Sequence, residues 1–286
     1  PREEVTVIMQ RIYSEPQKPE LIAKRVEEVK KGGGTAAVSF VPQNAKRMAP
    51  LAVEAGADMI VVQATVVTAR HSSKSLKGLI FSDLIKDIDV PILVGNTVSY
   101  EVTKELMQQG IHGVLVGVGP GSVCTSREVL GIGIPQVSAT VECAAARDDF
   151  FKETGKYIPI ITDGGIRTGG DVCKSFAAGA NAVMIGSPFA KCEEAPAKGY
   201  HWGMATWHVS LPRGTRIKMG TEYSLHQLLY GPSSRTDGTL NLVGALQVCM
   251  GYVGAENLRE MNNARMVYAP AMKTEGKIYQ AAGLGF

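Results

Sequence analysis

Short apolar runs alternate with amphipathic segments along most of this chain. The apolar runs are rich in β-branched residues and lack a polar residue at every second position, which is typical of strands buried on both faces. They span 36–41, 59–62, 91–94, 111–116, 158–161 and 182–185. In the segments that precede or separate them, apolar residues recur with helical spacing. The predicted helices span 19–31, 45–55, 76–86, 101–109, 141–154 and 170–178.

Several of these predicted helices end at a glycine just before the next strand. Gly56, Gly110 and Gly179 hold this place, where helices commonly end in a left-handed conformation that glycine adopts without steric cost. Polar or glycine-containing segments follow the strands instead. They contain Gln63, Asn96, 117–126, 163–165 and 186–187. Since the carboxyl ends of parallel strands meet at one face, we expect these segments to lie together.

Repeated βα units predict an α/β fold, a (β/α)8 TIM barrel, with a doubly wound sheet as the alternative. A closed barrel has eight units, whereas we count six. The sequence starts at Pro1 and not at methionine, so we expect two units to precede it and this chain to carry the last six. We expect 1–286 to form a single catalytic barrel domain, with a lid at about 199–240 and a C-terminal tail at 265–286.

The periodicity weakens in the expected lid. Residues 200–216 hold two histidines, two tryptophans and two arginines, and a long segment of this kind is typical of a functional lid. His201 and His208 are candidates for a role there, with surface positions as the alternative. Further helices are predicted at 225–230, 240–252 and 256–262.

Composition and charge narrow the classes of partner. The 286 residues are 45% hydrophobic and 20% charged, with a formal net charge of +3. This charge is too small to indicate a nucleic acid or membrane partner, and no apolar run reaches membrane-spanning length. The five cysteines are scattered, without a Cys-x-x-Cys pair. They argue against a disulfide framework or a structural zinc site and favour a reducing, cytoplasmic location.

One loop concentrates the candidate chemistry. The apolar run 114–116 is followed by Gly117, Gly119 and Gly121, so the chain turns sharply and exposes its backbone. Cys124 comes next. Exposed amides bind anions and exposed carbonyls bind cations, here close to a thiol that can act as a nucleophile. A buried, inert cysteine in an ordinary βα turn is the alternative.

Residues 119–127 read Gly-Pro-Gly-Ser-Val-Cys-Thr-Ser-Arg. This segment resembles the catalytic loop of the IMP dehydrogenase and GMP reductase family. Five further segments agree with the family in order and spacing, so that the resemblance covers nearly the whole chain. They are 95–96, 161–167, 183–187, 193–196 and 250–255. The family fold is a (β/α)8 barrel.

The resemblance narrows further to members without regulatory domains. Many relatives carry a CBS pair in the early barrel, but here Lys31 leads directly to Thr35 and the next strand, so we expect no CBS domain. This organisation matches the reductases and a short, CBS-free dehydrogenase-like branch. Segments 202–206 and 274–277 look most like that branch.

The resemblance implies roles for individual residues. Cys124 would attack the purine carbon between the two ring nitrogens, and Ser126 keeps a hydroxyl where the family has threonine. Asp163 would accept hydrogen bonds from the ribose hydroxyls. The remaining substrate-binding residues would be Ser122, Gly165, Gly186 and Ser187 at the phosphate, and Met204 at the base.

Two cofactors and an assembly are implied in the same way. NAD would accept the hydride, and a potassium ion would be held by the carbonyls of Gly119, Gly121 and Cys124. Gln63 and Asn96 would contact NAD, although the family has an aspartate at the position of Gln63. The family also implies a homotetramer.

We therefore predict NAD-dependent oxidation of IMP to XMP through a covalent Cys124 thioimidate. The Arg-Tyr pair that activates water in dehydrogenases is absent, and the sequence does not choose among its near-substitutes Arg213, Arg216, Tyr223 and Arg235. This absence favours an alternative, GMP reductase, which deaminates GMP to IMP with NADPH. A third hypothesis is a catalytically inactive regulator that binds purine nucleotides.

Overall fold

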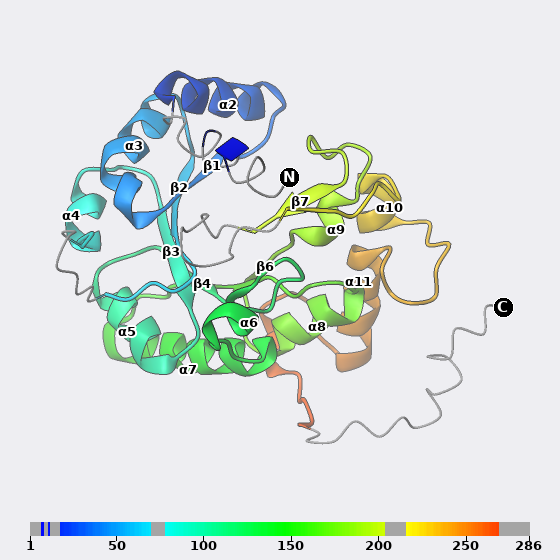
Figure 1. The fold of residues 1–286 in the computed structure, drawn as a ribbon. Coiled ribbons are helices and arrows are strands. Elements are labelled where there is room, and N and C mark those ends of the chain that lie inside the picture. The colour runs from blue at the N-terminus through cyan, green and yellow to red at the C-terminus, as the bar shows by residue number, and fades with distance from the viewer. Residues whose placement is uncertain (1–6, 9–10, 12–17, 70–77, 204–215, 269–286) are drawn as a thin grey trace.

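A curled half-barrel of six parallel strands forms the body of the protein, with helices along its outer side (Figure 1). The computed structural model describes residues 7–8, 11, 18–69, 78–203 and 216–268. The strands are β1 Ala37–Phe40, β2 Met59–Gln63, β3 Ile92–Thr97, β4 Gly113–Val116, β5 Ile160–Asp163 and β6 Ala182–Met184. Each strand pairs with the next along the chain. The six predicted strands and the α/β fold class are thus confirmed, as six units of a TIM-type barrel.

Apolar side chains cover both faces of this sheet. Ile60 and Ile92 belong to a large buried cluster between the strands and the helices. Val61, Leu93 and Leu115 form a second cluster on the inner face. Because successive residues of a strand point to opposite faces, two apolar faces require uninterrupted apolar runs. This explains the pattern seen in the sequence.

The helices connect these strands and continue beyond them. They are α2 Pro19–Lys31, α3 Pro42–Glu54, α4 Phe81–Lys86, α5 Tyr100–Gln108, α6 Ser126–Leu130, α7 Gln136–Thr154, α8 Gly169–Ala177, α9 Ser187–Ala190, α10 Leu225–Tyr230 and α11 Leu242–Val253. The glycines Gly56, Gly110 and Gly179 have φ values of 94°, 88° and 107°, as predicted. Helix α7 begins earlier than predicted because Pro135 provides an extended residue from which the helix starts.

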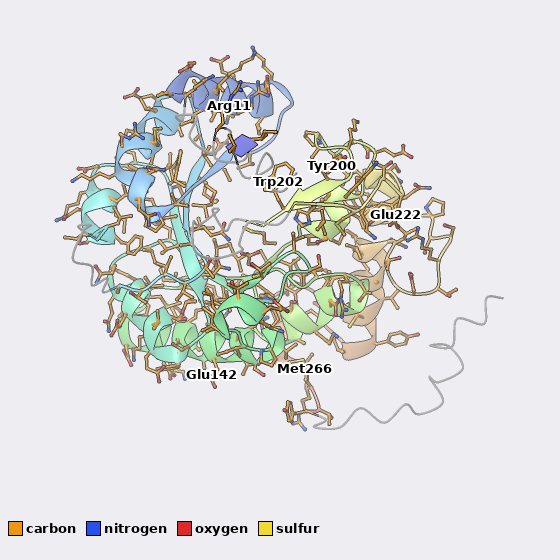
Figure 2. All side chains as sticks on the ribbon, viewed as in Figure 1. Arg11, Glu142, Tyr200, Trp202, Glu222 and Met266 are labelled. Carbon is orange, nitrogen blue, oxygen red and sulfur yellow. The ribbon has the colours of Figure 1, made fainter. Side chains whose placement is uncertain are left out.

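The segment after α9 contains a small antiparallel ribbon. Strand β7 Tyr200–Trp202 pairs with β8 Arg216–Lys218, and residues 204–215 between them lie outside the described residues. Tyr200 and Trp202 are labelled on this ribbon in Figure 2. The expected lid therefore starts from a paired strand.

One predicted helix was wrong. In place of a helix over 256–262, the chain forms a short 3-10 helix at Glu260–Asn263. The Asn257 side chain accepts a hydrogen bond from the Glu260 amide, and the Glu260 carboxylate accepts one from the Glu256 amide. Such local side-chain bonds to the backbone compete with a regular helix.

No helix within the described residues combines the length and the apolar character needed to cross a membrane.

Candidate active site

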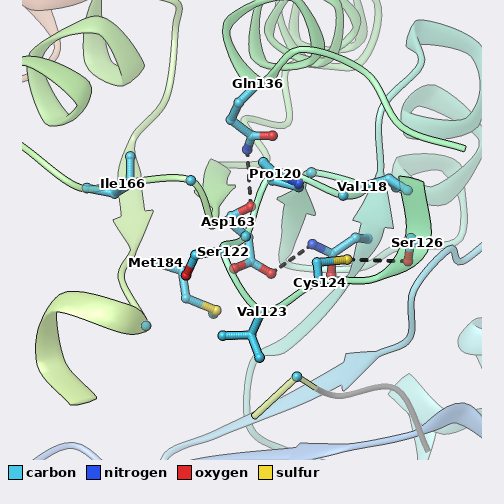
Figure 3. Close-up of a pocket in the computed structure, with 18 of the residues that line it drawn as sticks. Val118, Pro120, Ser122, Val123, Cys124, Ser126, Gln136, Asp163, Ile166 and Met184 are labelled. Atoms are coloured by element: carbon cyan, nitrogen blue, oxygen red, sulfur yellow. Dashed lines mark hydrogen bonds between the residues drawn. The ribbon is translucent and has the colours of Figure 1, made fainter. Parts of the chain in front are cut away.

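A cavity of about 820 Å³ opens at the carboxyl end of the strands (Figure 3). Segments that follow β2, β3, β4, β5 and β6 line it, together with the end of β7. The lining includes Gln63, Asn96, 117–127, 163–167, 184–187 and 201–203. The segments expected to meet at one face of the sheet are thus brought together. Ligand cavities in proteins commonly have volumes of about 300–1,000 Å³.

The thiol of Cys124 lies in the loop that follows β4. The Cys124 amide donates to the Gly121 carbonyl at 3.1 Å, which closes a turn at the tip of the loop. Its sulfur lies 3.3 Å from the Ser126 hydroxyl oxygen. Gly119 has a φ of 82°, and a Cβ there would lie 2.7 Å from Cγ of Arg127. The close packing of the loop against Arg127 therefore requires glycine at this position.

Among the described cysteines, Cys124 alone lines the cavity. Cys143, Cys173 and Cys192 are buried. Burial raises the pKa of Cys143 and of Cys173 to about 12, so these thiols stay protonated at neutral pH and are poor nucleophiles. Cys192 follows the end of α9 and forms an isolated bridge with Tyr223.

Three polar side chains from different strand ends form one network beside the thiol. Gln63 Nε2 donates to Asp163 Oδ2 at 2.7 Å and to Asn96 Oδ1 at 2.9 Å. Asn96 Nδ2 donates to the same Asp163 oxygen at 2.8 Å. Burial raises the pKa of the Asp163 carboxyl above its ordinary value, against the lowering effect of these hydrogen bonds. The residues expected at the cofactor and at the ribose are therefore joined.

The two serines expected at the phosphate lie together in the same cavity. The hydroxyls of Ser122 and Ser187 are 2.6 Å apart, and Ser187 Oγ lies 3.1 Å from His201 Nδ1. Gly165 and Gly186 line the same cavity. The sequence did not assign His201 to this group, because β7 brings it there from outside the barrel strands. Burial lowers the pKa of His201, which favours a neutral ring.

Gln136 is a second residue that the sequence did not single out. Its Nε2 donates to the carbonyls of Val116 at 2.6 Å and Asp163 at 3.2 Å, so it ties the ends of β4 and β5 together. Its Oε1 is buried without a hydrogen-bond partner among the described residues. The sequence signal was only a polar residue after Pro135, at a place where a loop was expected.

The expected water-activating and base-binding residues are only partly described. Met204 and Arg213 lie outside the described residues. Tyr223 is buried and donates to the Pro188 carbonyl at 3.2 Å. Arg235 donates to Glu222, which is labelled in Figure 2. The side chain of Arg216 is likewise not described. Tyr223 and Arg235 are both absent from the described lining of the cavity.

The two implied cofactors, NAD and potassium, would be held by different kinds of group. Both amide hydrogens of Gln63 are donated within the protein, and its carbonyl oxygen can still accept a hydrogen bond from a cofactor hydroxyl. The Gly121 carbonyl already accepts from Cys124. The described residues contain no group of three His, Cys, Asp or Glu side chains that could hold a metal. A potassium ion would therefore depend on backbone carbonyls, each of which has two lone pairs.

A family model and individual relatives of known sequence match this chain over most of its length. Residues 12–214 match the family described as "IMP dehydrogenase / GMP reductase domain". An uncharacterized oxidoreductase of Mycolicibacterium smegmatis is 38% identical over 257 residues, which cover 88% of this chain and 68% of that protein. An inosine-5'-monophosphate dehydrogenase of Aquifex aeolicus is 38% identical over 242 residues, covering 79% of this chain. The match spans 47% of the length of that dehydrogenase.

A solved structure agrees with these sequence matches. It is the crystal structure of an IMP dehydrogenase/GMP reductase-like protein from Corynebacterium glutamicum, with a TM-score of 0.82 and 35% sequence identity. The similarity covers 90% of this chain and 67% of the other.

Proposed function

This chain belongs to the IMP dehydrogenase / GMP reductase family of oxidoreductases, and from that membership we propose that it oxidises IMP to XMP with NAD. The observation that carries the proposal is the content of a single cavity. It holds the Cys124 thiol, the Asp163 carboxylate and the paired hydroxyls of Ser122 and Ser187. A thiol nucleophile, a ribose acceptor and a phosphate site are what a covalent reaction on a purine mononucleotide requires.

Binding of the nucleotide would use three parts of the cavity. The hydroxyls of Ser122 and Ser187 and the backbone at Gly165 and Gly186 would bind the phosphate, as exposed amides and hydroxyls do. Asp163 would accept hydrogen bonds from the ribose hydroxyls. The purine ring would then reach Cys124. A contact of Met204 with the base stays a prediction.

The reaction would form one covalent bond to the protein and break it again. The Cys124 sulfur bonds to the purine carbon between the ring nitrogens, and that carbon loses a hydride. NAD, held by Gln63 and Asn96, would supply the acceptor for the hydride. Water then adds to the thioimidate, the carbon–sulfur bond breaks, and XMP and the free thiol result. The one proton released overall is the proton that the Cys124 thiol loses when its sulfur bonds to the purine. The carbonyls of Gly119, Gly121 and Cys124 would hold potassium, whose charge would stabilise the shape of this loop.

GMP reductase is the second candidate. It would use the same Cys124 adduct, release ammonia from GMP and consume NADPH. The positions of Tyr223 and Arg235 favour it, since neither residue lines the cavity where water would be activated. An inactive nucleotide-binding regulator stays the third hypothesis.

One assay separates these functions. The protein is incubated with IMP plus NAD and separately with GMP plus NADPH, while the absorbance of the reduced cofactor is followed. Growth of absorbance in the first mixture supports the dehydrogenase, and decay in the second supports the reductase. Cys124→Ser is the control in both. Nucleotide binding without turnover in either mixture would support the regulator and contradict our proposal.

Location and assembly are part of the same proposal. We expect a cytoplasmic enzyme, in keeping with five free cysteines. We also expect a single catalytic domain, with a lid at about 199–240 and without a CBS pair. We expect a homotetramer, which sedimentation velocity of the purified protein would test.

A further inference from the structure

We propose that Gln63 is a positioning residue for the nucleotide, acting through Asp163. Its side-chain amide holds the Asp163 carboxylate in the orientation that receives the ribose hydroxyls. The inference rests on the proposed function, because the ribose contact of Asp163 is part of that function. It adds a second role to the one drawn from the sequence, in which Gln63 serves the cofactor.

The hydrogen bonds leave Gln63 no further donor. An amide nitrogen carries two hydrogens, and those of Gln63 go to Asp163 Oδ2 at 2.7 Å and to Asn96 Oδ1 at 2.9 Å. Asn96 adds a second bond to Asp163 Oδ2 at 2.8 Å. One carboxylate oxygen therefore accepts two bonds from the protein. The other, Oδ1, receives none from the described residues and is the oxygen available to a ligand.

Among the described residues, the side-chain amides of Gln63 and Asn96 are the main hydrogen-bond donors to the Asp163 carboxylate. Gln63 and Asn96 are 7% and 6% exposed; Gln63 is the last residue of β2, and Asn96 is the last but one of the neighbouring strand β3. A buried carboxylate needs donors to replace the lost water. The other titratable or charged side chains that line the cavity are Cys124, Arg127, Arg167, Asp171 and His201.

None of those side chains supports the carboxylate directly. Among the described contacts, Arg127 donates to the Ile134 carbonyl and Arg167 pairs with Asp171 at 3.6 Å. Cys124 and His201 contact the hydroxyls of Ser126 and Ser187. The ionised form of Asp163 therefore depends on neutral donors that come from Gln63 and Asn96.

A change of Gln63 to glutamate tests the contact through its charge. Gln63→Glu keeps the size of the side chain and places a second carboxyl against Asp163 Oδ2. Two carboxylates in hydrogen-bond contact cannot both ionise easily, so they share one proton and the pKa of the pair is raised. With the proton present, the hydrogen bond to Asp163 is restored. With the proton lost, the two carboxylates repel each other and Asp163 leaves its position.

The experiment is IMP binding without cofactor, measured by calorimetry from about pH 6 to about pH 9. We expect the IMP affinity of Gln63→Glu to fall about tenfold or more as the pH rises, relative to wild type. Gln63→Met, which has similar size and no donor, should bind IMP about tenfold more weakly at every pH. Gln108→Glu makes the same chemical change at an exposed position on α5 and should follow wild type.

The outcomes separate this inference from the proposed function. If Gln63→Glu follows wild type in IMP affinity at each pH while its KM for NAD rises, Gln63 acts on the cofactor alone and the inference is overturned. If wild type does not bind IMP, the proposed function fails. Thermal unfolding then still tests the contact, because Gln63→Glu must lose stability relative to Gln108→Glu as the pH rises. Equal stability profiles would overturn it.

Discussion

The sulfur of Cys124 lies 3.3 Å from the hydroxyl oxygen of Ser126, which is only 2% exposed in the first turn of α6. A hydroxyl in this place can donate to the thiolate that the reaction needs. A hydrogen bond to a charged group contributes about 1.5–3 kcal/mol, and about 1.4 kcal/mol changes a rate tenfold. Ser126→Ala should therefore lower kcat about tenfold or more, while IMP affinity stays close to wild type. Ser126→Thr keeps the hydroxyl and should stay active; equal kcat values for all three proteins would contradict this role.

Removal of the nucleophile should abolish turnover without abolishing binding. Cys124→Ala is expected to lower kcat by about a thousandfold or more, because covalent catalysis has no substitute in the cavity. The IMP affinity should change little, since phosphate and ribose contacts remain. Mass spectrometry of the quenched enzyme should show the covalent adduct in wild type and in Cys249→Ala, a change at the other partly exposed cysteine. An adduct on the Cys124→Ala protein would refute the assignment.

Asp163 should make the protein less stable as the pH rises. Burial raises the pKa of its carboxyl, so the folded protein holds this proton to a higher pH than the unfolded chain does. Stability from this group is complete below the ordinary pKa of about 4 and is lost as the pH rises through the raised value. Asp163→Asn should thus have a higher Tm than wild type at neutral pH, and the gain should vanish in acid.

The same change should weaken IMP binding, because the ligand-facing carboxylate oxygen is replaced or neutralised. Calorimetry and thermal unfolding of one preparation give both results. Asp89→Asn, at an exposed position, is the control. A lower Tm for Asp163→Asn at neutral pH would contradict the argument.

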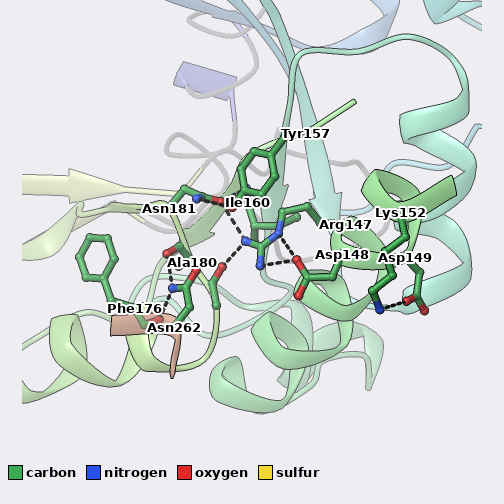
Figure 4. A network of polar contacts seen from close by, with 11 residues as sticks. Arg147, Asp148, Asp149, Lys152, Tyr157, Ile160, Phe176, Ala180, Asn181 and Asn262 are labelled. Carbon is green, nitrogen blue, oxygen red and sulfur yellow. Dashed lines mark hydrogen bonds and ion pairs between the residues drawn. The ribbon is translucent and has the colours of Figure 1, made fainter. Parts of the chain in front are cut away.

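Arg147 stabilises the opposite end of the barrel (Figure 4). It is 3% exposed, donates to the Gly179 carbonyl at 2.6 Å and to Asn181 Oδ1 at 3.0 Å, and stacks on the ring of Tyr157. Arg147→Ala leaves the Gly179 carbonyl without this donor and removes one of the two donors to Asn181 Oδ1, which keeps the bond from the Ile160 amide. The loss should cost about 3 kcal/mol in the free energy of unfolding. Urea unfolding measures the loss.

The control for Arg147 is an exposed cation on the same helix. Lys152 pairs with Asp149, but its side chain is 73% exposed, and Lys152→Ala should leave the free energy of unfolding near that of wild type. Equal losses for the two variants would show that the buried network contributes nothing particular.

The packing of α8 on α11 should depend on one of two adjacent glycines. A Cβ on the buried Gly169 would overlap the side chain of Ala245, whereas a Cβ on the exposed Gly170 would meet only Thr168, 3.7 Å away. Gly169→Ala should therefore destabilise the protein by about 1–3 kcal/mol. Gly170→Ala should be neutral or stabilising, by at most about 1 kcal/mol. Thermal unfolding that ranked the two variants in the reverse order would contradict this packing.

The prediction failed where local bonds compete with periodicity. The apolar pattern at 256–262 suggested a helix, but the bonds among Glu256, Asn257 and Glu260 shorten it to a 3-10 turn at Glu260–Asn263. At α7, the extended conformation of Pro135 starts the helix before the apolar pattern does.

The sequence alone determined the six strands, the helices between them and the loop that carries Cys124. These features depend on periodicity, glycine and proline within a few neighbouring residues, so they are present in the local sequence. Only the tertiary structure joined Gln63 to Asp163, a hundred residues later in the chain, and placed His201 against Ser187. Such contacts arise because the strands end at one face and a ribbon from outside the barrel reaches the cavity. No local pattern specifies which side chains then come within hydrogen-bond distance.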